Sequence, residues 1–232
     1  MIHVDFIDIT RVSKEDIDFI CEVLPDNFQR RVKGNLITKK TSLLGRALLY
    51  MNSLEFSSKE LDKLTFSLKH TGKLYLEDSP AFNISHGGKY VALAISSCNE
   101  PIEIGLDIEK NRAVNSLEDL SSYFALEEQE EIYKQKKKAE AFLKIWTRKE
   151  AFYKAIGTGI YTKNSLKKIN CLDNKVNYKG DDWYFNTSEL AENYWVSCVS
   201  NKKSKVVFRE RNLKELKTIK PQYNNNILHH FL

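Results

Sequence analysis

Two short apolar segments with a similar pattern constrain the fold of this chain more than any other sequence feature. Tyr90 to Ser96 (YVALAIS) resembles Tyr194 to Ser200 (YWVSCVS), and both are typical of buried strands. Each follows a helical pattern at a comparable distance, 90 − 41 = 49 residues in one case and 194 − 141 = 53 in the other. The segments are either unrelated strands or equivalent parts of an internal duplication. A duplication would give two similar α+β halves that meet near residue 103, with a ligand cleft between them.

The composition is that of an ordinary folded protein, with 232 residues, 42% hydrophobic and 29% charged. The longest apolar run, Val91 to Ile95, is far shorter than the roughly 20 residues of a membrane span. The N-terminal residues include acids and lack the basic region of a signal peptide, so no signal peptide is expected. The four cysteines are widely spaced and include no CxxC pair, so we expect a reducing, cytoplasmic location rather than a disulfide or zinc framework.

The net charge of +5 is unevenly distributed. Residues 202–220 contain eight cations and two acids, or +6, so the rest of the chain sums to 5 − 6 = −1. A second basic segment has six cations and no acid, namely Arg30, Arg31, Lys33, Lys39, Lys40 and Arg46. Such a segment is either a solvated face or a surface that holds phosphates.

Ile104 to Glu109 (IGLDIE) alternates with the period of a strand. Gly105, Asp107 and Glu109 share one face, and their carboxylates project in parallel. A divalent cation or a basic partner would relieve the repulsion between them, and hard oxygen ligands suit Mg²⁺. Glycine on the same face leaves room for a close approach. The alternative is a solvated edge of a sheet.

Two of the expected helices run from Leu43 to Leu54, with a cap at Thr41 or Ser42, and from Ala141 to Ile156, with an end at Gly157. On the second helix, a buried stripe contains Phe142, Ile145, Trp146, Tyr153 and Ile156.

Lys149 falls within this apolar stripe, where an ammonium group must reach water or meet an anion. Glu150 and Lys154 lie at its margin as i,i+4 neighbours. They form either an ordinary helix ion pair or part of a cleft.

The segment Phe82 to Gly88 (FNISHGG) places Ser85 and His86 before two glycines, where exposed backbone N–H groups can hold an anion. Neighbouring side chains on an extended chain point apart, and no GxSxG elbow is present, which excludes a serine hydrolase of that type. The alternative is a turn with a hydrogen-bonded histidine.

Four short motifs follow one another along the chain: Gly72-Lys73, Phe82 to His86 (FNISH), Ile104 to Lys110 (IGLDIEK) and Trp146 to Lys154 (WTRKEAFYK). In order and spacing they resemble the 4′-phosphopantetheinyl transferases of the Sfp type. The segments Ser42 to Gly45 and Phe124 to Glu128 look similar as well, and the likeness extends from about residue 28 to about residue 160. One departure is Leu74, where a proline often follows the Gly-Lys turn.

The resemblance implies an α+β fold of two similar halves, residues 1–103 and 104–232, related by pseudo-twofold symmetry with the active site at their interface. The second half would carry the metal-binding carboxylates. The implied reaction transfers the 4′-phosphopantetheine arm of coenzyme A to a serine of an apo acyl or peptidyl carrier protein, with Mg²⁺, and releases adenosine 3′,5′-bisphosphate. Carriers of fatty-acid, polyketide and nonribosomal-peptide biosynthesis all fit. We expect a monomer, with neither nucleic acid nor a membrane as partner.

The resemblance also implies roles for individual residues. Asp107, Glu109 and Glu150 would bind the metal, and Glu150 would instead or also act as general base on the carrier serine. Lys154 would neutralise charge on the leaving phosphate, so the implied catalytic set is Asp107, Glu150 and Lys154. The implied coenzyme A contacts are Ser42, Lys73, Ser85, His86 and Lys154, together with Arg30 and Arg31.

Two other functions compete with this one. The same three carboxylates could serve a Mg²⁺-dependent phosphodiesterase or nuclease that uses water as its acceptor. Alternatively, a non-catalytic module could bind nucleic acid through its basic surface, although no RNP-like pattern of aromatic residues is evident.

Overall fold

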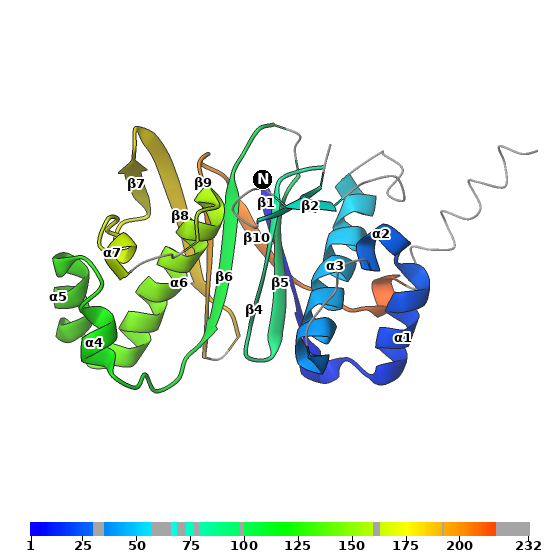
Figure 1. Ribbon diagram of the computed structural model, residues 1–232, viewed down its shortest axis with the longest axis horizontal. Coiled ribbons are helices and arrows are strands. Elements are labelled where there is room, and N and C mark those ends of the chain that lie inside the picture. The colour runs from blue at the N-terminus through cyan, green and yellow to red at the C-terminus, as the bar shows by residue number, and fades with distance from the viewer. Residues whose placement is uncertain are drawn as a thin grey trace, which may run out of the picture.

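The computed structural model describes residues 1–29, 35–56, 66–68, 73–76, 79–97, 100–159, 163–191 and 193–216. In this part of the chain, two four-stranded sheets pack against each other, and helices cover the outer face of each (Figure 1). The layers therefore run helices, sheet, sheet, helices. This mixed architecture confirms the expected α+β class.

The first sheet has the strand order β10 (Val206–Glu210), β1 (Ile2–Asp8), β5 (Tyr90–Ser96) and β4 (Phe82–Gly87). Its neighbours are antiparallel except for β10 and β1, which are parallel. The helices on its outer face are α1 (Lys14–Val23), α2 (Asp26–Gln29) and α3 (Leu36–Phe56). A 3-10 turn, η1 (Ile9–Arg11), follows β1, and β2 (Phe66–Leu68) pairs with β3 (Leu74–Leu76) in a separate hairpin.

The second sheet is antiparallel throughout, in the order β6 (Ile104–Lys110), β9 (Tyr194–Ser200), β8 (Asp181–Glu189) and β7 (Lys175–Tyr178). The helices of this part are α4 (Leu117–Ser121), α5 (Leu126–Lys134), α6 (Lys138–Ile156) and α7 (Lys163–Leu166). Gly157 ends α6 with a left-handed φ of 73°, a conformation in which glycine is favoured.

The two sheets contain the same three-strand arrangement. In the first, β1 pairs antiparallel with β5 and β5 with β4; in the second, β6 pairs in this way with β9 and β9 with β8. In each case a long helix comes earlier in the chain than the last two of these strands: α3 comes before β4 and β5, and α6 comes before β8 and β9. Tyr90 and Tyr194, the first residues of the two similar segments, pack edge to face with ring centroids 4.8 Å apart.

Three apolar clusters fill the spaces between the layers. Leu48 and Leu93 belong to the cluster between α3 and the first sheet, and Phe152 and Phe185 to the cluster between α6 and the second. The third cluster joins the sheets and includes Ala94 and Leu106. Both faces of each sheet are therefore covered, which explains why β5 is buried along its whole length.

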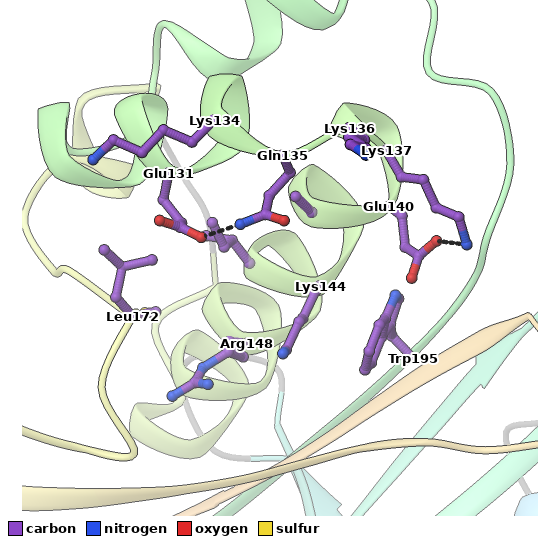
Figure 2. A pocket seen from close by; sticks show the side chains of 13 residues that line it. Glu131, Lys134, Gln135, Lys136, Lys137, Glu140, Lys144, Arg148, Leu172 and Trp195 are labelled. Carbon is purple, nitrogen blue, oxygen red and sulfur yellow. Dashed lines mark hydrogen bonds and ion pairs between the residues drawn. The ribbon is translucent and has the colours of Figure 1, made fainter.

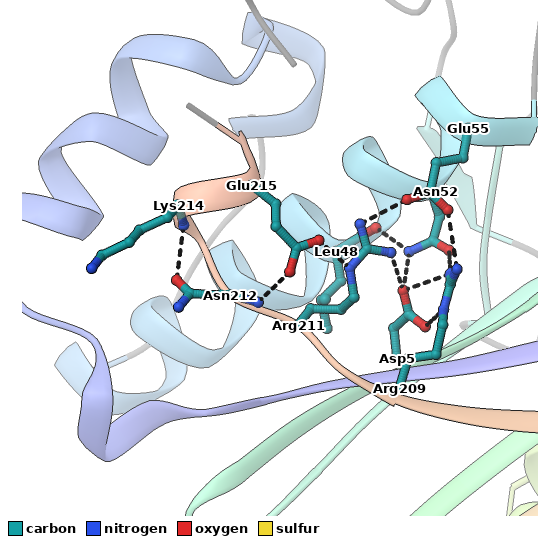
Figure 3. Close-up of polar contacts among 9 residues, drawn as sticks. All are labelled: Asp5, Leu48, Asn52, Glu55, Arg209, Arg211, Asn212, Lys214 and Glu215. Atoms are coloured by element: carbon teal, nitrogen blue, oxygen red, sulfur yellow. Dashed lines mark hydrogen bonds and ion pairs between the residues drawn. The ribbon is translucent and has the colours of Figure 1, made fainter. Parts of the chain in front are cut away.

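The C-terminal strand β10 is tied to the first sheet by a buried ionic network (Figure 3). Asp5 of β1 is fully buried and accepts hydrogen bonds from Arg209 Nε at 2.7 Å, Arg211 at 2.7 Å and Asn52 at 2.9 Å. Glu55 of α3 accepts a further bond from Arg211 at 2.7 Å. Residues 206–211 therefore pack with the first sheet although they lie within the segment 104–232.

The strands expected at the N-terminus, at 90–96, at 104–109 and at 194–200 are confirmed. The start of the first helix is corrected: α3 begins at Leu36, and Asn35 accepts a hydrogen bond from Thr38 N at 2.9 Å. Thr41 lies inside the helix and donates to Ile37 O at 3.1 Å, so it is not a cap. Among the described residues, no helix combines the length and apolar character needed to cross a bilayer.

Candidate functional site

The candidate site lies where β4 of the first sheet runs beside β6 of the second. A Cβ atom at Gly87 would collide with the carbonyl oxygen of Ile108, so glycine allows the two backbones to approach closely. Asn83 of β4 accepts a hydrogen bond from Leu106 N at 2.9 Å. These contacts bring side chains from the two sheets together.

Ser85, Asp107 and Lys154 meet at this junction, each from a different motif. Lys154 Nζ lies 2.6 Å from Asp107 Oδ1 and 3.0 Å from Ser85 Oγ, and Ser85 Oγ donates to Asp107 Oδ1 at 3.1 Å. Asp107 Oδ2 is buried and accepts no hydrogen bond from any residue that the structure describes. A buried carboxylate oxygen without a donor is costly, which indicates that a cation or a donor is missing there.

Close packing of α6 on β6 sets this geometry. Gly105 lies on the same face of β6 as Asp107, and a Cβ atom there would collide with the Ala151 carbonyl oxygen and the Ala155 amide of α6. The glycine therefore provides the space that its place in the sequence indicated, and a helix backbone fills that space. Lys154 follows on the same helix and reaches Asp107.

Glu109 and Glu150 complete an acidic group that we call the carboxylate cluster (Asp107, Glu109 and Glu150). Burial and then the charge of Asp107 raise the pKa of Glu109, whereas Arg112, Lys154 and a hydrogen bond from Trp146 lower it. Burial and Asp107 likewise raise the pKa of Glu150, and Lys154 opposes them. The three carboxylates and Lys154 thus lie within electrostatic range of one another.

Lys73 bridges the two parts of the fold. Its ammonium group donates to Glu103 Oε2, Ile104 O and Ala155 O, each at 3.0 Å, and its side chain is only 9% exposed. An ammonium has three N–H donors, so these acceptors occupy its full capacity. A phosphate contact at Lys73, as the resemblance implies, would replace one of these bonds.

The other expected coenzyme contacts are less closely tied to this centre. His86 is exposed on β4, next to Ser85, and Ser42 is half-buried on α3. Arg30 and Arg31 lie outside the described residues.

Lys149 meets a buried anion, as its place on the apolar stripe requires. It is fully buried, lies 2.7 Å from Glu128 Oε2 and donates to Leu166 O and Ile169 O. Glu128 also accepts bonds from Ala125 N and Cys171 N. Sequence reasoning did not find this partner, since Glu128 lies in the charged segment of α5. Trp146 and Ile156, expected within the stripe, are only half-buried.

No three His, Cys, Asp or Glu side chains within the described ranges are grouped as a ready-made metal site. Lys154 occupies one oxygen of Asp107, which leaves Oδ2 as the open position. The donor set nevertheless suits Mg²⁺, because this ion usually takes one or two carboxylates and fills its other positions with water and substrate phosphates.

Comparison with known protein families identifies the class. Residues 103–204 match the family model of the 4′-phosphopantetheinyl transferase superfamily. A 4′-phosphopantetheinyl transferase, gsp of Aneurinibacillus migulanus, is 30% identical over 171 residues, which is 68% of each chain. The chain therefore belongs to this superfamily of enzymes, and the resemblance seen in its four motifs is confirmed.

Other relatives match shorter stretches. The 4′-phosphopantetheinyl transferase Sfp of Bacillus subtilis (strain 168) is 35% identical over 125 residues, 51% of this chain and 53% of the relative. The 4′-phosphopantetheinyl transferase HetI of Nostoc is 35% identical over 92 residues, 38% of each chain. The matched part thus spans roughly half the length of Sfp and less of HetI.

Proposed function

We propose that this enzyme transfers the 4′-phosphopantetheine arm of coenzyme A to a serine of an apo acyl or peptidyl carrier protein. Adenosine 3′,5′-bisphosphate is the second product, and the reaction requires Mg²⁺. The observation that supports this function best is Asp107. One of its oxygens is paired with Lys154, while the other is buried and accepts no hydrogen bond from the part of the chain that the structure describes. A pyrophosphate with its bound cation is a ligand that such a pair of charges would accept.

The metal would be held by Asp107 together with Glu109 or Glu150. When bound, Mg²⁺ supplies positive charge against the pyrophosphate oxygens. The fit rests on the open Oδ2 of Asp107 and on an all-oxygen donor set. Lys154 lies 2.6 Å from Asp107 Oδ1, so it would lie beside the same phosphates.

Glu150 is the proposed base for the carrier serine. Its raised pKa makes it a better proton acceptor than an ordinary carboxylate. The serine oxygen forms a bond to the phosphorus that carries the pantetheine arm, its proton goes to Glu150, and the bond from that phosphorus to adenosine 3′,5′-bisphosphate breaks. Lys154 stabilises charge on the leaving phosphate. Ser85, His86, Ser42 and Lys73, with Arg30 and Arg31, would hold the nucleotide end of coenzyme A.

We further propose that the two halves, 1–103 and 104–232, are related by pseudo-twofold symmetry with the active site at their interface. The matching strand orders of the two sheets and the Tyr90–Tyr194 contact support this relationship. The bonds from Ser85 of β4 to Asp107 of β6, and from Lys73 to Ala155, support a site between the halves. In this division, β10 returns from the second half to the first sheet.

The test is mass spectrometry of apo carrier proteins incubated with the enzyme, coenzyme A and Mg²⁺. A gain equal to one phosphopantetheine group on the carrier serine is expected, and EDTA should prevent it. Carriers of fatty-acid, polyketide and nonribosomal-peptide synthesis should be assayed side by side. Hydrolysis of coenzyme A or nucleic acid with no carrier modified would instead indicate the phosphodiesterase.

A further inference from the structure

A separate groove lies along α5 and the first half of α6 (Figure 2). It has a volume of about 880 Å³. We call it the basic groove, because five cations and two acids line it: Lys134, Lys136, Lys137, Lys144 and Arg148, against Glu131 and Glu140. None of these residues belongs to the carboxylate cluster.

The two acids of the basic groove are already engaged within the chain. Glu140 lies 3.1 Å from Lys137, and Glu131 accepts a hydrogen bond from Gln135 at 2.5 Å. The groove therefore retains an excess of three positive charges, 5 − 2. An anionic partner would relieve the repulsion among these cations.

Arg148 adds an observation that exposed lysines do not provide. It is only 5% exposed and donates through Nη2 to Asp173 O and Asn174 Oδ1, yet its Nε is buried without a hydrogen-bond partner among the described residues. A buried charged donor without an acceptor is costly. Arg148 also lines the groove, so it adds a fixed positive charge to the floor of the groove.

The lining of the basic groove is partly apolar, with Ala141, Ile145, Leu172 and Trp195 among the cations. Lys144 lies over the Trp195 ring at 5.0 Å, and the Trp195 indole N–H is also buried without a hydrogen-bond partner among the described residues. Tryptophan and arginine are the residue types that most often dominate binding energy at protein interfaces. An apolar lining with a cationic rim fits an amphipathic acidic helix better than a small inorganic anion.

The basic groove is next to the carboxylate cluster. Trp195 of β9 is the register partner of Glu109 of β6, and neighbouring strands lie about 4.8 Å apart. Helix α6 carries Lys144 and Arg148 of the groove as well as Glu150 and Lys154 of the site. A protein that fills the groove would therefore lie beside the reacting groups.

We propose that the basic groove is the docking surface for an acidic amphipathic helix of the acceptor protein. This inference rests on the proposed transferase function and specifies how the acceptor is chosen. The groove selects the acceptor by charge, because a neutral or basic helix would leave its cations unpaired. Under the proposed function, coenzyme A would bind at the carboxylate cluster, so we expect the groove to affect the acceptor alone.

The test compares two double charge reversals that change the net charge equally. Lys136→Glu with Lys144→Glu alters the groove, whereas Lys203→Glu with Lys205→Glu alters exposed lysines beyond the far end of β9. With an acidic apo carrier, the groove variant should lose at least about tenfold in kcat/KM through a higher KM for the carrier. Its KM for coenzyme A and the kinetics of the control variant should stay within about twofold of the wild type. Lys→Arg replacements at 136 and 144 should retain activity.

Equal losses in both variants would indicate only long-range attraction, and no loss in either would exclude the groove, so both results overturn the proposal. Binding of the labelled apo carrier without coenzyme A separates this inference from the proposed function. If no carrier is modified but the wild type binds an acidic carrier and the groove variant does not, the transferase proposal fails and the docking surface stands. Wild-type binding of inorganic phosphate without binding of any carrier would overturn the docking surface.

Discussion

Lys154 and Asp107 form a 2.6 Å ion pair between α6 and β6, and this pair uses only one oxygen of the aspartate. Lys154 remains 31% exposed at its side chain, whereas that of Asp107 is 8% exposed. The buried oxygen that remains is the most specific prediction of a ligand in the described structure. Substitutions at Asp107 therefore test activity and stability separately.

Asp107→Ala should abolish transfer while leaving the fold intact. The carboxylate contacts Lys154 and Ser85 rather than the apolar clusters, and Lys154 can be hydrated once the pair is removed. We expect a loss of roughly 10²-fold or more in carrier modification by mass spectrometry, with a small change in melting temperature. Asp107→Asn, which keeps the shape, should lose as much. Near-normal transfer in either variant would exclude Asp107 as a metal ligand.

The pKa of Glu150 should respond in opposite directions to its two neighbours. Asp107→Asn should lower it because a negative charge is removed, whereas Lys154→Met should raise it. Carbon-13 NMR titration of the metal-free protein measures both effects. A shift in the same direction in the two variants would contradict the electrostatic origin.

The raised pKa of Glu150 also affects stability. The folded chain keeps this proton to a higher pH than the unfolded chain, so the contribution is fully present below the ordinary pKa of 4.5. It should be lost as pH rises from there through the raised pKa. Urea unfolding across this range should show a larger loss in the wild type than in Glu150→Gln, which retains the similar contribution of Glu109.

Lys149→Met should destabilise the chain by about 3–5 kcal/mol, because the carboxyl group of Glu128 would be left fully buried without its cation. Adding Glu128→Gln to this variant should recover part of the loss, since the second charge is then removed. Urea unfolding of the single and double variants provides the comparison. A double variant less stable than Lys149→Met would contradict this explanation.

Gly105→Ala should push α6 away from β6 and so disrupt the contact between Lys154 and Asp107. The new Cβ would meet helix backbone, which cannot rotate away, and we expect a cost of at least about 1–3 kcal/mol together with reduced transfer. Gly45→Ala is the matched control, because its Cβ would meet the Ile84 side chain at 2.7 Å, and a side chain can adjust. Calorimetry should place the Gly45 variant well above the Gly105 variant in melting temperature.

Much of the fold could be predicted from periodicity. The strands at 90–96, 104–110 and 194–200 are apolar or alternating over their whole length, and Gly157 ends α6 as its position indicates. The partners of Asp107 could be predicted only as members of motifs, because Ser85 lies 22 residues and Lys154 47 residues away along the chain.

Other features have no local signal in the sequence. Strand β10 is only partly buried, so its apolar pattern is weak, and ion pairs to Asp5 reinforce its pairing with β1. Glu128 resembles the neighbouring solvated acids of α5 and becomes distinct only when α6 places Lys149 against it. The basic groove combines α5, α6 and β9, and such a surface exists only after the chain has folded.

The return of β10 to β1 has a consequence for biosynthesis. The bond between Arg209 and Asp5 spans 204 residues, so at 5–20 residues per second the first strand leaves the ribosome on the order of 10–40 s before its parallel neighbour. During this interval one edge of the nascent sheet is unpaired and Asp5 has no arginine partner. The unpaired edge of β1 can therefore pair with other chains until β10 has been made, and slow translation of the last third would lengthen this exposure.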